Sequence, residues 1–287
     1  MIAGLIAAGP VVTDGAWGTQ LQARGLQPGD CPDEWNLTRP AAVEEVARAY
    51  VEAGSRVILT NTFRANRVTL AGHGLAGKTV EINRAGAAIS RRAAGDRAKV
   101  FASIGPSGKM LMAGETSEEE LREAFLEQAA ALRAGGADAL VVETMSDLTE
   151  ARIALEAAKT TGLPVVACMV YDSGRNKDRT MMGVTPEQAA GELAEAGADV
   201  IGANCGCGIE GYVGIARRLR AATLRPVWIK ANAGLPELVD GKTVWRMTAA
   251  KFASYVPQLV EAGTNFIGGC CGTGPDFIRA VAEALRR

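Results

Sequence analysis

The chain lacks an excess of charge of either sign. Its 287 residues include 31 Lys and Arg against 32 Asp and Glu, which gives a formal net charge of −1. Nucleic acids and anionic membrane surfaces attract proteins through clusters of positive charge. The balanced composition therefore indicates neither kind of partner, and we expect no nucleic-acid binding and no membrane binding.

The sequence also lacks the features of an exported or membrane-spanning chain. Its first residues, MIAGLIAAGPVV, are apolar, but they have no basic flank and are interrupted by Gly9 and Pro10. This stretch is too short for a signal peptide or a span, so we expect a cytoplasmic protein. Because cytoplasmic thiols are kept reduced, the six cysteines do not indicate a disulfide framework.

Several familiar motifs are incomplete or missing. The sequence GPSGK at residues 105–109 lacks the full Gly-x₄-Gly-Lys-Ser/Thr pattern of a phosphate-binding loop. There is no compact Cys-x-x-Cys pair to indicate a structural zinc site. The single histidine, His73, lies in LAGHGLAG, a sequence typical of a surface loop. Chemical function must therefore be sought in other residues.

Eight short apolar runs are spread along the chain, and each is typical of a buried strand. They are VVTDGAW from Val11, VILTNTF from Val57, VFASIGP from Val100, ALVVETM from Ala139, VVACMVY from Val165, VIGANCG from Val200, VWIKANAG from Val227 and FIGGCCG from Phe266.

Segments with helical periodicity separate these runs. Ser117 with Glu120, and Thr185 with Gln188, have the spacing of N-terminal capping boxes, and Pro186 suits the first helical position. Several helices are expected to end at a glycine in the left-handed conformation. These glycines are Gly54, Gly135 or Gly136, Gly162, Gly197 and Gly263.

The eightfold alternation of strand and helix predicts the fold class. Alternation favours parallel strands joined by right-handed crossovers. A doubly wound open sheet would alternate equally, but a count of eight favours an α/β protein with a (β/α)₈ barrel, a single domain over residues 1–287. Long polar links follow the strands at residues 17–37, 106–116, 171–184 and 234–247, where such a barrel builds its active site.

A weak internal repeat predicts which side chains lie at the same height. The segments EAGSRVILTNTF, AGGADALVVETM, EAGADVIGANCG and EAGTNFIGGCCG align without gaps at strands 2, 4, 6 and 8. Alternate barrel strands contribute to the same layer of side chains. One predicted layer comprises Asn61, Glu143, Asn204 and Cys270, and the next comprises Thr62, Thr144, Cys205 and Cys271.

This register brings three thiols together at the rim of the barrel. Cys205 comes from strand 6 and Cys270 and Cys271 from strand 8, with Asn232 on the strand between them. Three thiolates with an open fourth position are typical of a catalytic zinc site. Adjacent strand residues point to opposite faces, so the use of both neighbouring cysteines requires a break in the strand, which the glycines of GGCCGTG can supply.

Other interpretations of the cysteines remain open at this point. Cys168, within VVACMV, fits a buried small apolar residue. A disulfide between the neighbouring pair would be strained and disfavoured in a reducing compartment. Cys207 could compete as a metal ligand, and Cys31 in a polar loop has no assignment.

In combination, seven stretches resemble the zinc-dependent homocysteine S-methyltransferases, and among them the homocysteine-binding module of cobalamin-dependent methionine synthase is most similar. The stretches, in order over nearly the whole chain, are DGAWGTQLQ, NLTRPAAVEEVARAYVEAGSRVILTNTF, SIGPSGK, ETMSD, GANCG, KANAGLP and GGCCGT.

The resemblance implies roles for individual residues. Cys205, Cys270 and Cys271 would hold Zn²⁺, with the homocysteine sulfur in the fourth place and Asn232 as an oxygen ligand in the substrate-free state. Asp14 and Glu143 would hold the substrate ammonium, although strand-end acids can also simply cap the next helix. Backbone amides would meet the substrate carboxylate at Gly15, Ala16, Thr62 and Ser103 to Pro106.

The implied reaction is methyl transfer from an external donor to the thiolate of homocysteine, which gives methionine. Donors to be considered are methylcobalamin on a separate corrinoid protein, S-methylmethionine or S-adenosylmethionine, and betaine. Two alternatives remain: a non-autonomous homocysteine- and zinc-binding module of a methionine synthase made of several proteins, and a metal-free barrel lyase in which Lys230 forms a Schiff base.

Two further groups of side chains lie in or near the predicted rim loops. Aromatic residues could form a wall for a cationic donor, or could simply pack the loops; they are Trp17, Trp35, Tyr171 and Trp245. Four methionines could line an adaptable donor surface, although a local loop core is the favoured interpretation; they are Met110, Met112, Met181 and Met182.

Overall fold

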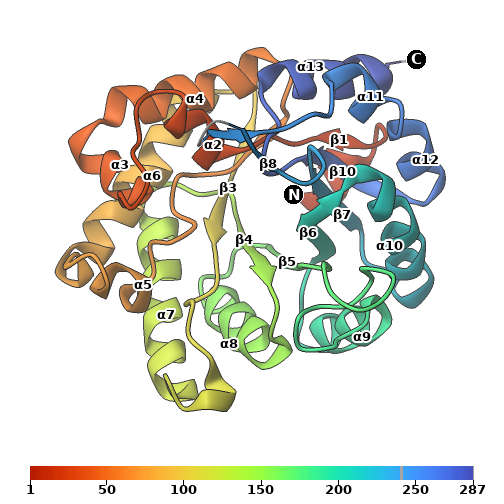
Figure 1. Ribbon diagram of the computed structural model, residues 1–287. Helices are drawn as coiled ribbons and strands as arrows, with labels where there is room; N and C mark the ends of the chain where they lie inside the picture. Colours follow the sequence, from red (N-terminus) through yellow and green to blue (C-terminus); the bar gives the residue numbers. More distant parts are fainter. Residues whose placement is uncertain (240–241, 287) are drawn as a thin grey trace.

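Eight short parallel strands form a ring at the centre of the structure, and helices surround it (Figure 1). The computed structural model describes residues 1–239 and 242–286. Neighbours around the ring follow the order β1-β10-β7-β6-β5-β4-β3-β2. The strands are β1 Val11–Val12, β2 Val57–Ile58, β3 Lys99–Ile104, β4 Ala139–Met145, β5 Val165–Met169, β6 Val200–Gly208, β7 Val227–Asn232 and β10 Thr264–Gly269.

The first and second strands bring the ring close to closure. The Arg56 amide, just before β2, donates to the Val12 carbonyl of β1 at 2.9 Å. The Ser55 hydroxyl donates to the Thr13 carbonyl at 3.1 Å. These bonds connect the two ends of the strand order, so the predicted single-domain barrel is confirmed over a doubly wound open sheet.

Apart from α1, the helices lie outside the ring, and most follow a strand as the alternation predicts (Figure 1). Their bounds are α1 Ile2–Ile6, α2 Trp17–Gln22, α3 Trp35–Thr38, α4 Pro40–Glu52, α5 Arg67–Ala71, α6 Thr79–Ala94, α7 Glu118–Ala134, α8 Leu148–Lys159, α9 Pro186–Glu195, α10 Ile209–Ala222, α11 Ala249–Ala253, α12 Val256–Glu261 and α13 Pro275–Ala284.

The predicted helix ends are largely confirmed. Thr185 and Gln188 form a reciprocal capping box at α9. At α7, Ser117 accepts from the Glu120 amide, but the Glu120 carboxylate bonds to the Thr116 hydroxyl, so only half of that box forms. The expected glycines have positive φ, at Gly54, Gly136, Gly162, Gly197 and Gly263.

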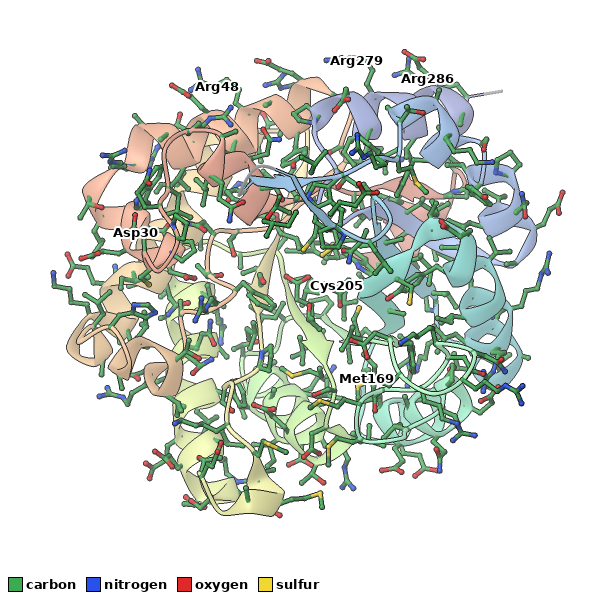
Figure 2. The ribbon with its side chains drawn as sticks, in the orientation of Figure 1. Asp30, Arg48, Met169, Cys205, Arg279 and Arg286 are labelled. Carbon is green, nitrogen blue, oxygen red and sulfur yellow. The ribbon has the colours of Figure 1, made fainter. Side chains whose placement is uncertain are left out.

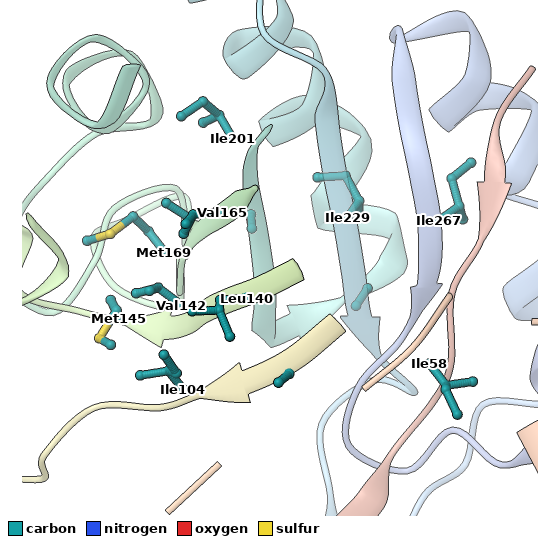
Figure 3. Close-up of a cluster of buried hydrophobic side chains, with 14 of the residues drawn as sticks. Ile58, Ile104, Leu140, Val142, Met145, Val165, Met169, Ile201, Ile229 and Ile267 are labelled. Atoms are coloured by element: carbon teal, nitrogen blue, oxygen red, sulfur yellow. The ribbon is translucent and has the colours of Figure 1, made fainter. Parts of the chain in front are cut away.

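Alternation along the strands divides the apolar side chains into two clusters. One includes residues of all eight barrel strands, among them Phe101, Trp228 and Phe266, whose rings have centroids 5.2–6.3 Å apart. Side chains of α1 pack against this cluster, and the N-terminus lies within the ring in Figure 1. The other cluster includes Leu140 and Ile229 and contains most of the helix residues (Figure 3).

Three of the predicted loops contain secondary structure, and residues 106–116 include a 3₁₀ turn at Leu111–Ala113. Residues 17–37 include α2, a 3₁₀ turn at Pro32–Glu34 and part of α3. The segment 234–247 includes an antiparallel pair, β8 Glu237–Val239 and β9 Lys242–Val244, and residues 240 and 241 lie outside the described part. Among the described residues, no helix has both the length and the apolar character that a membrane crossing requires.

Candidate metal and substrate site

A layer of polar side chains lies directly above the apolar interior of the barrel. Ser103 follows Phe101 by two residues, and Lys230 follows Trp228 in the same way. Because side chains two apart on a strand share a face, these polar groups point toward the barrel axis, as the apolar residues do. Figure 2 shows Cys205 near the middle of the ring.

Three cysteines meet at this level, as the register predicts. The sulfur atoms of Cys205, Cys270 and Cys271 all lie within 4.8 Å of one another. The Cys205 and Cys271 sulfurs are 4.0 Å apart, although the two residues come from strands that are separated by β7. The predicted equivalence in height is therefore confirmed.

The backbone departs from strand geometry at these cysteines. Strand β10 ends at Gly269, which leaves Cys270 and Cys271 in a turn, and Gly272 has φ of +81°. A Cβ on Gly269 would lie 2.2 Å from the Thr273 hydroxyl, so only glycine fits there. Cys205 has φ of 63°, a strained conformation for a side-chain-bearing residue, and strain of this kind clusters at functional sites.

The three thiols fit a tetrahedral metal. Four sulfurs at about 2.3 Å from zinc are about 3.8 Å from one another, close to the separation observed here. Contacts from Cys270 and Cys271 lower the pKa of Cys205 to about 3. The contact with Cys205 raises the pKa of Cys270 to about 12 and also raises the pKa of Cys271. Metal binding needs all three sulfurs as thiolates, so a divalent cation would displace the protons that the cluster still holds.

Two asparagine side chains hold the cysteines in place. Asn232 donates to the Gly206 carbonyl at 2.8 Å, lies 3.8 Å from the Cys205 sulfur and accepts from the Cys271 amide at 2.9 Å. Asn204 lies 3.9 Å from the Cys270 sulfur. Asn232 thus connects both halves of the cluster, and its predicted role as an oxygen ligand stays a prediction.

A cavity of about 320 Å³ opens onto the thiols. Its lining includes all three cysteines, together with Glu143 and Lys230. Gly15, Ala16, Trp17 and Ser103 also line it, whereas Asp14 and Thr62 do not. An amino acid carrying a thiol would therefore meet both sulfur ligands and charged groups within one cavity.

Glu143 is a buried acid that faces this cavity. It accepts hydrogen bonds from the Ser103 hydroxyl and, at 3.1 Å, from the Asn204 side chain. Burial raises the pKa of Glu143 to about 7, against the opposing pull of the positive charge on Lys230. A cationic group next to this carboxyl would offset the cost of its burial, which suits the predicted contact with a substrate ammonium.

Asp14 and Lys230 form a buried ion pair. Their side chains are 0% and 2% exposed, respectively. Burial lowers the pKa of Lys230, but the negative charges of Asp14 and Glu143 outweigh this effect and raise it. A Schiff-base lysine needs the opposite, a lowered pKa that frees the amine. The ion pair therefore argues against the lyase alternative.

Several of the predicted carboxylate-binding amides are already bonded within the protein. The Ala16 amide donates to the Thr273 carbonyl at 3.0 Å, and the Gly105 amide donates to the Phe63 carbonyl at 2.9 Å. The Ser103 amide donates to the Thr60 hydroxyl at 3.0 Å. Binding of a substrate carboxylate by these amides stays a prediction.

The remaining cysteines lie outside the cluster. Cys168 is fully buried in the barrel interior, which confirms its interpretation as a small apolar residue. Cys207 is not part of the group of three among the described residues. Cys31 is buried, and its sulfur lies 4.0 Å from the Asp33 carboxylate.

The rim residues divide into buried and exposed groups. Trp35 and Tyr171 are buried and serve packing, whereas Trp17 lines the cavity. Trp245 lies next to Gly272, just after the cysteine pair. The four methionines line one separate cavity, and Met110, Met112 and Met181 are 47%, 79% and 63% exposed, so the favoured interpretation of a loop core is wrong for these three.

Three features of the site were missed from the sequence. The sequence indicates Lys230 only as a candidate nucleophile, and its pairing with Asp14 joins residues 216 positions apart. The sequence indicates Asn204 only as the residue equivalent to Glu143 in the internal repeat. Asp33, a buried acid in the cavity lining, had no signal in the sequence beyond its place in a long polar loop.

Comparison with known proteins identifies the family. The family model described as "Homocysteine S-methyltransferase" matches residues 11–285. The chain is 30% identical to betaine–homocysteine S-methyltransferase 1 of Danio rerio, over 96% of this chain and 72% of that protein.

The chain belongs to the homocysteine S-methyltransferase family.

The chain is also similar to two methionine synthases, but it matches only part of their length. The chain is 33% identical to the methionine synthases of Mycobacterium leprae and Mycobacterium tuberculosis, over 96% of this chain but only 24% of theirs. It therefore spans about a quarter of the length of these two relatives.

Solved structures support the family fold. The homocysteine methyltransferase MmuM of Escherichia coli superposes in its oxidised form with a TM-score of 0.82 over 99% of both chains, at 23% identity. Its metallated form gives a TM-score of 0.80 over 97% of this chain and 96% of that one. This likeness confirms the barrel fold.

We expect Cys271→Ala to abolish tight zinc binding. Loss of a residue that only hydrogen-bonds to a metal ligand typically weakens metal affinity by about 10- to 100-fold. Loss of a ligand itself should therefore weaken the affinity by more than about 100-fold. The matched control is Cys207→Ala, which removes a half-buried thiol outside the cluster. Zinc retained after dialysis is measured by elemental analysis. Equal retention by both variants would contradict the three-thiol site.

We expect Asp33→Asn to change how stability depends on pH. Burial raises the pKa of Asp33 to about 7, so the folded state holds this proton more tightly than the unfolded state does. The wild-type chain should therefore lose up to roughly 4 kcal/mol of stability from this group as pH rises from about 4 to 7. The variant should escape this loss, because an asparagine side chain does not titrate. Its side-chain oxygen can still accept from the Arg64 backbone amide.

Urea unfolding between pH 5 and 8 measures this difference. The exposed Asp30, on the same loop, provides the control variant Asp30→Asn. Parallel stability curves for the wild type and Asp33→Asn would show that the carboxyl is already ionised at low pH and that the expectation is wrong.

Proposed function

We propose that this chain binds zinc through Cys205, Cys270 and Cys271 and transfers a methyl group to the thiolate of homocysteine, which gives methionine. The convergence of three thiols at a cavity with buried charged groups supports this most directly. Membership of the homocysteine S-methyltransferase family supports homocysteine as the acceptor.

The chemistry of the donor set favours zinc. Three thiolates are soft ligands that select zinc over metals preferring oxygen. A zinc ion held by three thiolates supplies a site at which a fourth sulfur stays deprotonated at neutral pH, where a free thiol is mostly protonated. The reaction needs such a thiolate, because it is the nucleophilic form.

The residues of the chain orient the acceptor. Asn204 and Asn232 keep the cysteines in position, and Glu143 receives the substrate ammonium. The substrate sulfur then attacks the methyl carbon of the donor: the S–CH₃ bond forms as the donor–CH₃ bond breaks, and the donor leaves with the bonding electrons. Trp17 lines the cavity, and Trp245 lies beside the cysteine pair, so both can exclude water from this step.

The methyl donor is external to the described barrel. The relatives include methionine synthases and a betaine–homocysteine S-methyltransferase, so the donor classes to be tested are methylcobalamin on a corrinoid protein, betaine and S-methylmethionine. Since the chain spans 24% of the methionine synthases, a non-autonomous module that depends on a corrinoid partner is the second candidate.

A donor panel tests the proposal. The zinc-loaded chain is incubated with homocysteine and each donor in turn, and methionine is measured by mass spectrometry. We expect methionine from one donor class, and Cys271→Ala should lower the rate by at least about 100-fold. Methionine formed only from methylcobalamin would favour the module; methionine formed from a sulfonium or betaine alone would favour an independent enzyme. No methionine from any donor, together with no binding of homocysteine, would refute the proposal.

A further inference from the structure

The buried ion pair in the cavity calls for an explanation beyond stability. Asp14 and Lys230 are almost completely removed from solvent. The desolvation of two charges costs about as much as their attraction returns, so a buried pair by itself is weak evidence for a stabilising role. Its place beside the thiols suggests that one member serves the substrate.

Asp14 is not the member that faces the substrate. One of its carboxylate oxygens accepts from Lys230, and the other accepts from the Trp17 side chain at 2.8 Å and from the Leu59 amide at 2.7 Å. It is fully buried and does not line the cavity. Both oxygens are therefore engaged within the protein.

Lys230 does line the cavity. Its ammonium group has three N–H donors, and among the described residues only the Asp14 carboxylate accepts from it. Two donors are left for a ligand, and Asp14 holds the group in place. The only other cation in the lining, within the part of the chain that is described, is the exposed side chain of Arg64, where solvent screens the charge.

Glu143 faces the same cavity with the opposite charge. Its carboxylate accepts from Ser103 and Asn204 and keeps further lone pairs free. The charge of Lys230 acts on Glu143, so an acidic and a basic group lie near each other at the cavity wall. An α-amino acid carries its ammonium and its carboxylate on one carbon and can meet both at once.

We propose that Lys230 determines specificity by binding the α-carboxylate of the thiol substrate, while Glu143 binds its α-ammonium. This inference rests on the proposed function and adds the residue that recognises the substrate carboxylate. The amides of Ala16, Ser103 and Gly105 are already used within the protein, and Lys230 offers a charged donor for this carboxylate.

The test compares L-homocysteine with 3-aminopropane-1-thiol, the analogue that lacks the carboxylate. Binding of each to the zinc-loaded full chain is measured by calorimetry, without a methyl donor. A charge-assisted hydrogen bond in a buried site is worth about 10- to 100-fold in affinity. We expect the wild type to bind homocysteine more tightly than the analogue by at least this factor.

Substitution of the lysine should remove this preference. Lys230→Met should weaken homocysteine by about 10- to 100-fold and the analogue by less than threefold. Asp14 is then left buried without its partner, so the double variant Asp14→Asn/Lys230→Met, which removes both charges, is measured as well. Lys78→Met, on the surface, controls for the loss of one positive charge. Zinc content and circular dichroism report on folding.

The outcomes separate the inference from the proposed function. If the wild type binds homocysteine and the analogue equally, or if the lysine variants keep the wild-type preference, Lys230 does not bind the carboxylate and the inference is overturned while the proposed function stands. If the wild type binds neither thiol, the proposed function fails, and the inference fails with it.

Discussion

The site depends on breaks in strand geometry at one end of a ring of eight parallel strands. Cys205 on β6 has a positive φ, and Cys270 and Cys271 follow the end of β10 in a turn, so the three thiols meet across the intervening β7 although alternation alone could not point all of them to one axis. Phe101, Trp228 and Phe266 fill the barrel interior below the thiols. The thiols therefore lie above a packed apolar core and not above a channel. Alternation does point Ser103, Glu143 and Lys230 inward, and a slip of one residue in β3, β4 or β7 would turn that side chain to the outside.

The polar side chains above this apolar core cost free energy to bury, and hydrogen bonds and an ion pair within the protein offset that cost. Asp14 is paired and hydrogen-bonded, Glu143 is held by Ser103 and Asn204, and Asn232 connects the cysteines. Thr144, like Cys205, has a positive φ, and the two are equivalent in the internal repeat. Buried charge and backbone strain at the same level are typical of a site organised for binding rather than for stability.

Much of this arrangement could be predicted from the sequence, because it follows from periodicity. The eight strands, the convergence of the three cysteines and the strand break at Gly269 all result from local patterns and a shared register. The pairing of Asp14 with Lys230 could not be predicted, since it joins residues 216 positions apart and depends on side-chain length and burial. The β8–β9 pair and the exposure of Met112 depend likewise on how the loops pack, for which no periodic signal exists.

The most direct test of the account is the number of sulfur atoms around the bound metal before and after homocysteine is added. X-ray absorption at the zinc edge of the full chain measures this number. The account predicts three sulfurs and one lighter ligand in the free protein, and four sulfurs with distances of about 2.3 Å after homocysteine binds. A spectrum with fewer than three sulfurs, or one that homocysteine leaves unchanged, would contradict it.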